Sequence, residues 1–232
     1  MKWREWNELP KSLRVPEVQE YYDILSKKKH SLRLKRCFDV VAALIMLICF
    51  SPIMLVISAA IVLDSPGGVF YRQERVTQYG KMFRIHKFRT MVSNADKIGT
   101  QVTVENDNRI TKIGSILRKY RLDEMPQLVD ILEGNMSFVG TRPETKKYVK
   151  AYTPEMRATL LLPAGITSEA SIRYKDEAKL LEVGDDVDRV YVEKVLPGKM
   201  KYNLEAIKKF SFFYDIATMF RTVFAVLGKE YK

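Results

Sequence analysis

One long apolar run dominates the pattern of hydrophobic and polar positions along the chain. Residues Val40–Leu63 contain no charged side chain, and a helix of that length would reach about 36 Å, against about 30 Å for the hydrocarbon core of a bilayer. Ser51-Pro52 stands near the middle of the run, where proline removes a backbone donor and disfavours a straight helix. The run therefore predicts a membrane helix that is broken at its centre.

Both flanks of the apolar run are basic. Lysines and arginines cluster between positions 27 and 36 and again between 72 and 89, and positive charge marks the cytoplasmic side of a membrane helix. A helix that enters one leaflet, bends and returns keeps both flanks in the cytoplasm, whereas a single span does not. The residues alone leave a re-entrant helix and a proline-kinked span as equal alternatives. In either case we expect the Ser51 hydroxyl to bond a backbone group that Pro52 leaves free.

Shorter patterns follow the run and predict a mainly helical α+β fold. Val69–Val76 and Met82–Phe88 are rich in Val, Phe, Tyr and Arg around a glycine turn, which predicts a β-hairpin. Apolar residues at helical spacing then predict one helix that ends near Tyr120 and a second that stops at Gly134. The same spacing from Leu204 to Phe220 predicts one C-terminal amphipathic helix that docks or lies at a membrane interface.

Composition limits the chemical classes of partner that the protein could bind. The chain has 232 residues and a net charge of +11, an excess that favours anionic partners such as nucleic acid, acidic lipid or phosphorylated substrates. Its two cysteines, Cys37 and Cys49, indicate no disulfide framework. The segment before the run is polar, unlike a secretory signal peptide, so we expect the run to be retained and the rest of the chain to be cytosolic.

An acid pair, Asp123-Glu124, stands between the two predicted helices. Acids near a helix N-terminus often serve only as caps. Here, however, Arg118 precedes the pair and Arg142 follows the next turn, and such an arrangement suits a phosphate held together with a divalent metal. His30 and His86 are isolated in the sequence, and we expect surface or packing roles for them.

Several separated blocks resemble, in the same order, the bacterial sugar transferases, which are small monotopic phosphoglycosyl transferases. The blocks are KRCFDVVAA, FSPIML, DSPGGVFYRQERVTQYGKMFRIHKFRTM, DNRITKIGSILRKYRLDEMPQLVDIL, MSFVGTRPE and PAGITS, with a looser match at LPGKMKYNLE. The resemblance covers about residues 35–177 and implies the small form of the family, without a large multi-span N-terminal domain. We expect three parts: an N-terminal basic extension (1–36), the first thirty or so residues of which have no counterpart in the family pattern, a re-entrant membrane helix (37–63) and a cytosolic catalytic domain (64–232).

The resemblance implies a reaction and roles for the acids. Ser51 and Pro52 would form the break of a monotopic anchor in the bacterial inner membrane, with the catalytic domain facing the cytoplasm. Asp123 would attack the sugar-linked phosphorus of a UDP-sugar, release UMP and pass the phosphosugar to polyprenyl phosphate. Glu124 would act as a base or help to hold the metal. Mg²⁺ would sit against the pair with Asp123 as its ligand.

The resemblance further implies that basic residues hold the substrate phosphates, without separating donor from acceptor. These residues are Arg72, Arg75, Lys87, Arg89, Arg118 and Arg142. It implies no nucleic-acid partner and leaves a homo-oligomer open. Departures from the family pattern at Asn135, Thr141 and Ser168 put the identity of the sugar in doubt.

The competing hypothesis is a membrane-tethered basic adaptor without catalysis. In such a protein Asp123-Glu124 would only cap a helix, and the basic residues would bind acidic lipid or nucleic acid. No nucleic-acid-binding motif appears in the sequence, and an adaptor could not release UMP.

Overall fold

The apolar run forms most of α2 (Lys29–Asp64) in a computed structural model that describes residues 3–95, 107–174 and 187–226. Within those ranges α2 is the one helix long and apolar enough to cross a membrane, with a mean hydropathy of 2.9 over its most apolar window and 11% of that window buried. Large apolar side chains such as Ile48, Leu55 and Leu63 are exposed along it. An apolar helix with so little protein around it suits a lipid environment.

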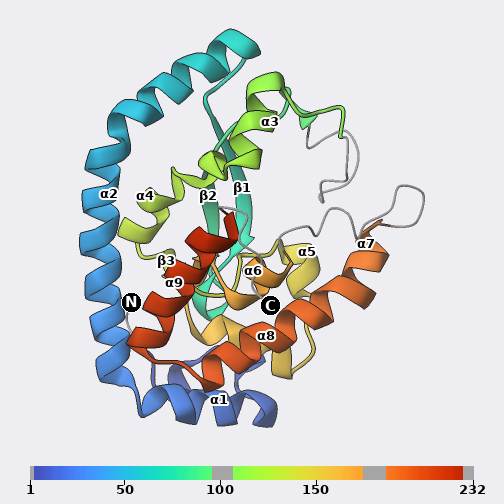
Figure 1. The fold of residues 1–232 in the computed structure, drawn as a ribbon. Coiled ribbons are helices and arrows are strands. Elements are labelled where there is room, and N and C mark those ends of the chain that lie inside the picture. Colours follow the sequence, from blue (N-terminus) through green and yellow to red (C-terminus); the bar gives the residue numbers. More distant parts are fainter. Residues whose placement is uncertain (1–2, 96–106, 175–186, 227–232) are drawn as a thin grey trace.

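α2 bends near its middle and does not break, which corrects the predicted interruption at Ser51-Pro52. The helix is continuous through Pro52, and the Ser51 hydroxyl donates a hydrogen bond to the Ile48 carbonyl at 2.8 Å. That carbonyl lies four residues before Pro52 and would otherwise lack its helical donor, so the prediction for Ser51 is confirmed. The second half of α2 leans over the rest of the chain (Figure 1).

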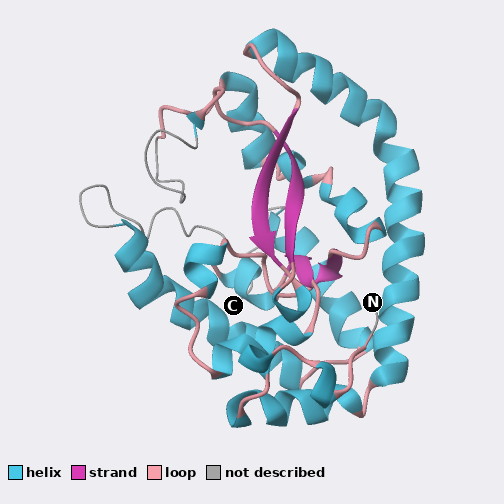
Figure 2. Ribbon diagram, turned by 180° about the vertical axis from the view of Figure 1, so that it is seen from behind, coloured by secondary structure: helices cyan, strands magenta, loops and turns pink. Residues whose placement is uncertain are grey.

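The predicted hairpin is confirmed and lies under the bent half of α2 (Figure 2). β1 (Phe70–Val76) pairs antiparallel with β2 (Met82–Phe88), from Phe70 opposite Phe88 to Val76 opposite Met82. Ile57 and Ile61 of α2 form a cluster with Phe88 and with Leu117. The second half of α2 therefore packs directly on the hairpin.

A second sheet was not predicted. β3 (Met136–Val139) pairs parallel with β4 (Ala164–Thr167), and β4 passes very close to Gly140, the residue that follows β3. A Cβ added at Gly165 would come within 2.1 Å of the Gly140 nitrogen, so only glycine allows this approach. Both strands are four residues long, too short to show a clear alternation in sequence.

The two predicted helices around the acid pair are confirmed. They are α3 (Lys112–Lys119), which is capped at Tyr120, and α4 (Gln127–Leu132), which ends before Gly134 in the left-handed conformation. Further short elements of the described chain are η3 (Gln78–Gly80), α5 (Lys146–Val149), η6 (Glu155–Leu161), α6 (Glu169–Arg173), α7 (Val187–Val190) and η8 (Tyr191–Val195).

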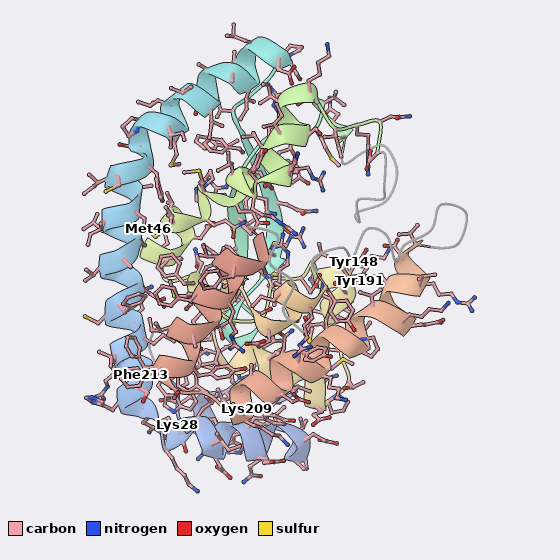
Figure 3. The ribbon with its side chains drawn as sticks, in the orientation of Figure 1. Lys28, Met46, Tyr148, Tyr191, Lys209 and Phe213 are labelled. Carbon is pink, nitrogen blue, oxygen red and sulfur yellow. The ribbon has the colours of Figure 1, made fainter. Side chains whose placement is uncertain are left out.

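The C-terminal segment forms two helices, α8 (Leu196–Lys208) and α9 (Phe212–Val226), where the sequence predicts one. The break lies at a packing contact, because the Lys28 ammonium donates to the Phe210 carbonyl. α9 then turns back along the first half of α2 (Figure 1), where Lys35 and Asp215 form a buried ion pair at 2.6 Å. Phe213 remains exposed near this corner (Figure 3).

The N-terminal segment packs onto the rest of the chain. It folds into η1 (Trp6–Glu8), η2 (Lys11–Leu13) and α1 (Pro16–Ser26). Leu13, Val18 and Leu25 are buried against residues of η6 and α8. The division into an extension, a membrane helix and a catalytic domain stays a prediction, and the proposed boundary at residue 36 falls inside α2.

Candidate active site

The acid pair lies in a tight turn between α3 and α4. Arg121 adopts the left-handed conformation, with φ 57°, and the 3₁₀ turn η5 (Leu122–Glu124) follows it directly. Both acids are buried there, with 9% of Asp123 and 7% of Glu124 exposed. Burying two adjacent carboxylates is costly unless other groups compensate them, so their neighbours define the site.

Glu124 is held by two cations from distant parts of the sequence. The Lys87 ammonium lies 3.0 Å from Oε1, and the Arg142 guanidinium donates one hydrogen bond to Oε2 at 3.2 Å and a second to Oε1. Burial opposes ionisation of Glu124, but Arg142 and Lys87 outweigh it and hold the pKa of this carboxyl below its usual range. Glu124 is therefore an ionised anchor for both cations.

Asp123 has different surroundings. Its carboxylate makes no hydrogen bond within the residues that the structure describes. Burial is the main cause that raises its pKa, the charge of Glu124 adds to this effect, and Lys87, Arg142 and Arg118 oppose it. A carboxylate that is near cations but not bonded to them can reach an incoming electrophile or metal.

The structure brings four of the six predicted phosphate-binding residues together. Lys87 and Arg142 bond Glu124, and the charge of Arg118 acts on Asp123. Arg75 lies close enough to Arg142 for the two charges to repel each other. It donates a hydrogen bond to the Pro143 carbonyl at 3.2 Å, and its Nε is buried without a hydrogen-bond partner in the described chain. Burial lowers the pKa values of Lys87, Arg75 and Arg118, as expected where cations are crowded in a partly dry space.

Arg72 and Arg89 lie elsewhere. Arg72 alternates with Arg75 along β1, so it faces the other side of the hairpin, and it donates to the Arg84 carbonyl at 2.8 Å. Arg89 is buried and bonds the turn after α2, with Nη1 donating to Ser65 Oγ and Nη2 to the Ser65 carbonyl, each at 2.7 Å. The structure thus gives Arg89 a scaffold role at the end of α2.

The predicted magnesium at Asp123 fits the site as a single carboxylate ligand. Mg²⁺ is commonly bound by one or two carboxylates together with substrate phosphates and water, and Glu124 is already engaged by Lys87 and Arg142. Among the described residues, a set with metal-ligand spacing lies elsewhere, at His86, Asp130 and Glu133. His86 there donates its backbone N–H to Asp130 at 2.9 Å and its ring pairs with the same carboxylate, which confirms its packing role.

Sequence reasoning missed a buried polar group beside the site. Glu144 accepts a hydrogen bond from the Tyr191 hydroxyl, and Lys199 donates to that hydroxyl at 2.9 Å. Tyr191 packs against Tyr148 (Figure 3), with ring centroids 4.7 Å apart. The negative charge of Glu144 also attracts Arg75, so this buried polar group helps to hold Arg75 in place beside the site. Its only signal in the sequence was the position of Glu144 two residues after Arg142.

Two of the three departures from the family pattern meet in space. Thr141 and Ser168 line one small open cavity between the ends of β3 and β4 and the helices α8 and α9. Asn135 is not part of that wall, because its side chain bonds Lys81 and Glu133. The cavity walls also carry buried polar side chains such as Asn203 and Thr218.

Comparison with known proteins identifies the family. The family model for bacterial sugar transferases matches residues 30–229, and the chain belongs to this family. It is 38% identical over 215 residues to UDP-glucose:undecaprenyl-phosphate glucose-1-phosphate transferase of Escherichia coli, which covers 90% of this chain and 43% of that protein. It is 34% identical over 197 residues to UDP-N-acetylgalactosamine-undecaprenyl-phosphate N-acetylgalactosaminephosphotransferase of Aeromonas hydrophila, which covers 84% of this chain and 44% of that protein.

A shorter relative matches over most of its own length. The chain is 37% identical over 159 residues, 68% of its length, to a putative undecaprenyl-phosphate N-acetylgalactosaminyl 1-phosphate transferase of Bacillus subtilis, of which it covers 87%. By contrast, it spans less than half of the Escherichia coli and Aeromonas proteins. The relatives' names agree on the undecaprenyl-phosphate acceptor and differ in the sugar.

Proposed function

We propose that the protein transfers a sugar 1-phosphate from a UDP-sugar to undecaprenyl phosphate, as the first membrane step of glycan assembly. The observation that carries the proposal is the contrast within the acid pair: Glu124 is bonded to Lys87 and Arg142, whereas Asp123 beside it makes no hydrogen bond within the described chain. The relatives are named as transferases to undecaprenyl phosphate, which supports the acceptor. The sugar is left open.

The proposed reaction has two steps, each a displacement at the same phosphorus. An Asp123 oxygen attacks the sugar-linked phosphorus of the donor, and the bond from that phosphorus to the bridging oxygen breaks as UMP leaves. A phosphate oxygen of the lipid then attacks the phosphosugar on Asp123, which forms the diphosphate and frees the carboxylate. Such a covalent intermediate separates transfer from a soluble donor and transfer to a lipid into two easier steps.

The cations around the pair support both displacements. Lys87 and Arg142 are held in place by Glu124, and with Arg118 and Arg75 they offset the charge of the phosphates as phosphoryl transfer requires. Asp123 would hold Mg²⁺, which supplies further charge neutralisation to the diphosphate when bound. Glu124 acts chiefly by orienting the two cations, since its lowered pKa makes it a weak base.

The bend in α2 supports a monotopic arrangement in the inner membrane. α2 bends at Pro52 and its second half returns to pack on Phe88 and Leu117, next to Lys87 and Arg118 of the site. A straight span would pull these contacts apart. We therefore propose a re-entrant helix in the cytoplasmic leaflet, with the acid pair on the cytoplasmic side near the lipid phosphate.

The test is UMP release by the full chain in lipid nanodiscs, with a panel of UDP-sugars, Mg²⁺ and undecaprenyl phosphate. We expect wild type to release UMP with one donor or a few, and Asp123→Asn to lose at least about 10³-fold in turnover because an amide is a poor nucleophile. Asp23→Asn, an exposed site on α1, is the matched control and should keep wild-type activity.

Two results would count against the proposal. Comparable activity in Asp123→Asn would exclude the covalent intermediate on this residue. No UMP from any donor, in a sample that still associates with the nanodisc, would favour the non-catalytic adaptor.

A further inference from the structure

Gln127 is an unexplained buried polar residue next to the acid pair. It is the first residue of α4, and 1% of its surface is exposed. Its amide nitrogen Nε2 has no hydrogen-bond acceptor in the described part of the chain. Leaving a buried amide donor unpaired destabilises a fold, so each such group calls for an explanation.

The backbone places Gln127 beside both acids. Met125 and Pro126 are right-handed helical, so the chain winds as a helix from η5 into α4. Residues three and four apart on a helix are side-chain neighbours. Gln127 is three residues after Glu124 and four after Asp123, so its amide shares their face.

That face meets β2. Glu124 contacts the Lys87 ammonium at 3.0 Å, and one turn beyond Gln127 the Asp130 carboxylate contacts His86 at 2.8 Å. Gln127 therefore lies between two contacts to consecutive residues of the same strand. The segment that carries Gln127 therefore packs against β2 next to Lys87.

An acceptor for this donor has to arrive with a ligand. The surrounding side chains of Lys87, Arg142 and Arg118 make the space favourable for anionic oxygens, and the transferred phosphoryl group would occupy it. We propose that Gln127 is a further catalytic residue whose Nε2 donates a hydrogen bond to a phosphoryl oxygen of the sugar phosphate that Asp123 receives. This inference rests on the proposed function and assigns the residue a task within it.

A neutral donor is suited to this position. The phosphosugar must leave Asp123 again for the lipid acceptor, and a further buried cation would hold it more tightly in both states. A preorganised amide instead orients the phosphoryl oxygens without adding net charge, and such donors act mainly on the charge that develops in the transition state.

The test combines stability with activity in two variants of the full chain. Gln127→Met keeps the approximate volume and removes the donor, so we expect Tm to rise by about 2–4 °C while kcat for UMP release falls on the order of 10²-fold. The KM for the donor should change much less. Gln127→Glu keeps the shape but replaces the donor by a charged acceptor, and we expect a loss at least as large.

Ser137 on β3 is the matched control. It is also buried with 1% exposed, and its Oγ also lacks a partner in the described chain, but it lies on β3, where it pairs with Gly165 of β4. Ser137→Ala should leave Tm unchanged or raise it and keep UMP release within about twofold of wild type.

Three outcomes would overturn the inference. Gln127→Met with wild-type kcat would show that no donor is needed, and a joint fall in Tm and kcat would show a structural role. An active Gln127→Glu would exclude a donated hydrogen bond. A wild type that releases no UMP removes the proposed function as well, whereas active wild type with active Gln127→Met removes only this inference.

Discussion

At the scale of single residues, the surroundings of Asp123 and Glu124 separate two acids that look equivalent in sequence. Glu124 is bonded on both oxygens to Lys87 and Arg142, so its carboxylate serves as an anchor. Asp123 lies within range of the same cations without a bond to them. Adjacent side chains of one type can thus take opposite roles when one of them satisfies the local cations.

The same argument predicts how much activity is lost when each basic residue is replaced. We expect Arg142→Met to lower kcat/KM for the UDP-sugar on the order of 10²–10³-fold, because it removes a proposed phosphate ligand and one of the two cations that hold Glu124. Arg72→Met is the matched variant, on the opposite face of the hairpin with its guanidinium on a carbonyl, and should stay within about threefold. Equal losses in the two variants would contradict this assignment of the site.

At the scale of elements, α2 connects the apolar run to the site. Arg89 bonds the turn after the helix at Ser65, and the Asp64 carboxylate accepts the Ile113 N–H of α3 at 2.9 Å. α3 in turn carries Arg118. The end of α2 therefore holds α3, and with it Arg118, in place through the Asp64–Ile113 contact.

The bend in α2 predicts the effect of Pro52→Ala. Alanine restores the backbone donor to the Ile48 carbonyl and allows a straight helix, so we expect the variant to favour a spanning topology. The measurement is maleimide labelling of an engineered N-terminal cysteine in intact cells, in a background with Cys37→Ala and Cys49→Ala. Labelling that stays restricted to the cytoplasmic side in Pro52→Ala would contradict the prediction.

A second connection joins α2 to α9. Lys35 donates to the Val139 carbonyl at 2.9 Å and pairs with Asp215, and both side chains are almost fully buried. Removing one partner of such a pair leaves a buried charge without compensation, so α9 is fixed on the first half of the helix while the hairpin and α3 are fixed on the second.

At the scale of the whole molecule, the N-terminal segment is part of the core. Leu25 is fully buried in a cluster shared with Leu161 and Ile207. We expect Leu25→Ala to cost about 2–5 kcal/mol, which lowers Tm by roughly 5–15 °C in a chain of this size. Leu63→Ala, at a side chain that is 87% exposed, should change the stability by less than about 0.5 kcal/mol. A silent Leu25→Ala would mark the segment as a separate extension.

Several features followed from the sequence because they depend on local chemistry. The apolar run, its proline and the serine that bonds a free carbonyl act within one helix. The hairpin and the two helices around the acid pair are likewise set by short-range patterns and turn residues. The family blocks, read in order, also predicted the acid pair and the four basic residues that lie around it.

Other features were decided only by the tertiary structure, because they join residues far apart in the chain. The β3–β4 pairing, the break between α8 and α9 at the Lys28 contact, and the burial of the N-terminal segment have no local signal. The same holds for the division of the cations: Arg72 and Arg75 stand three residues apart on one strand, and the alternation of side chains sends only Arg75 toward the acids. Sequence determined which chemical groups the protein has, and packing determined which of them meet at Asp123.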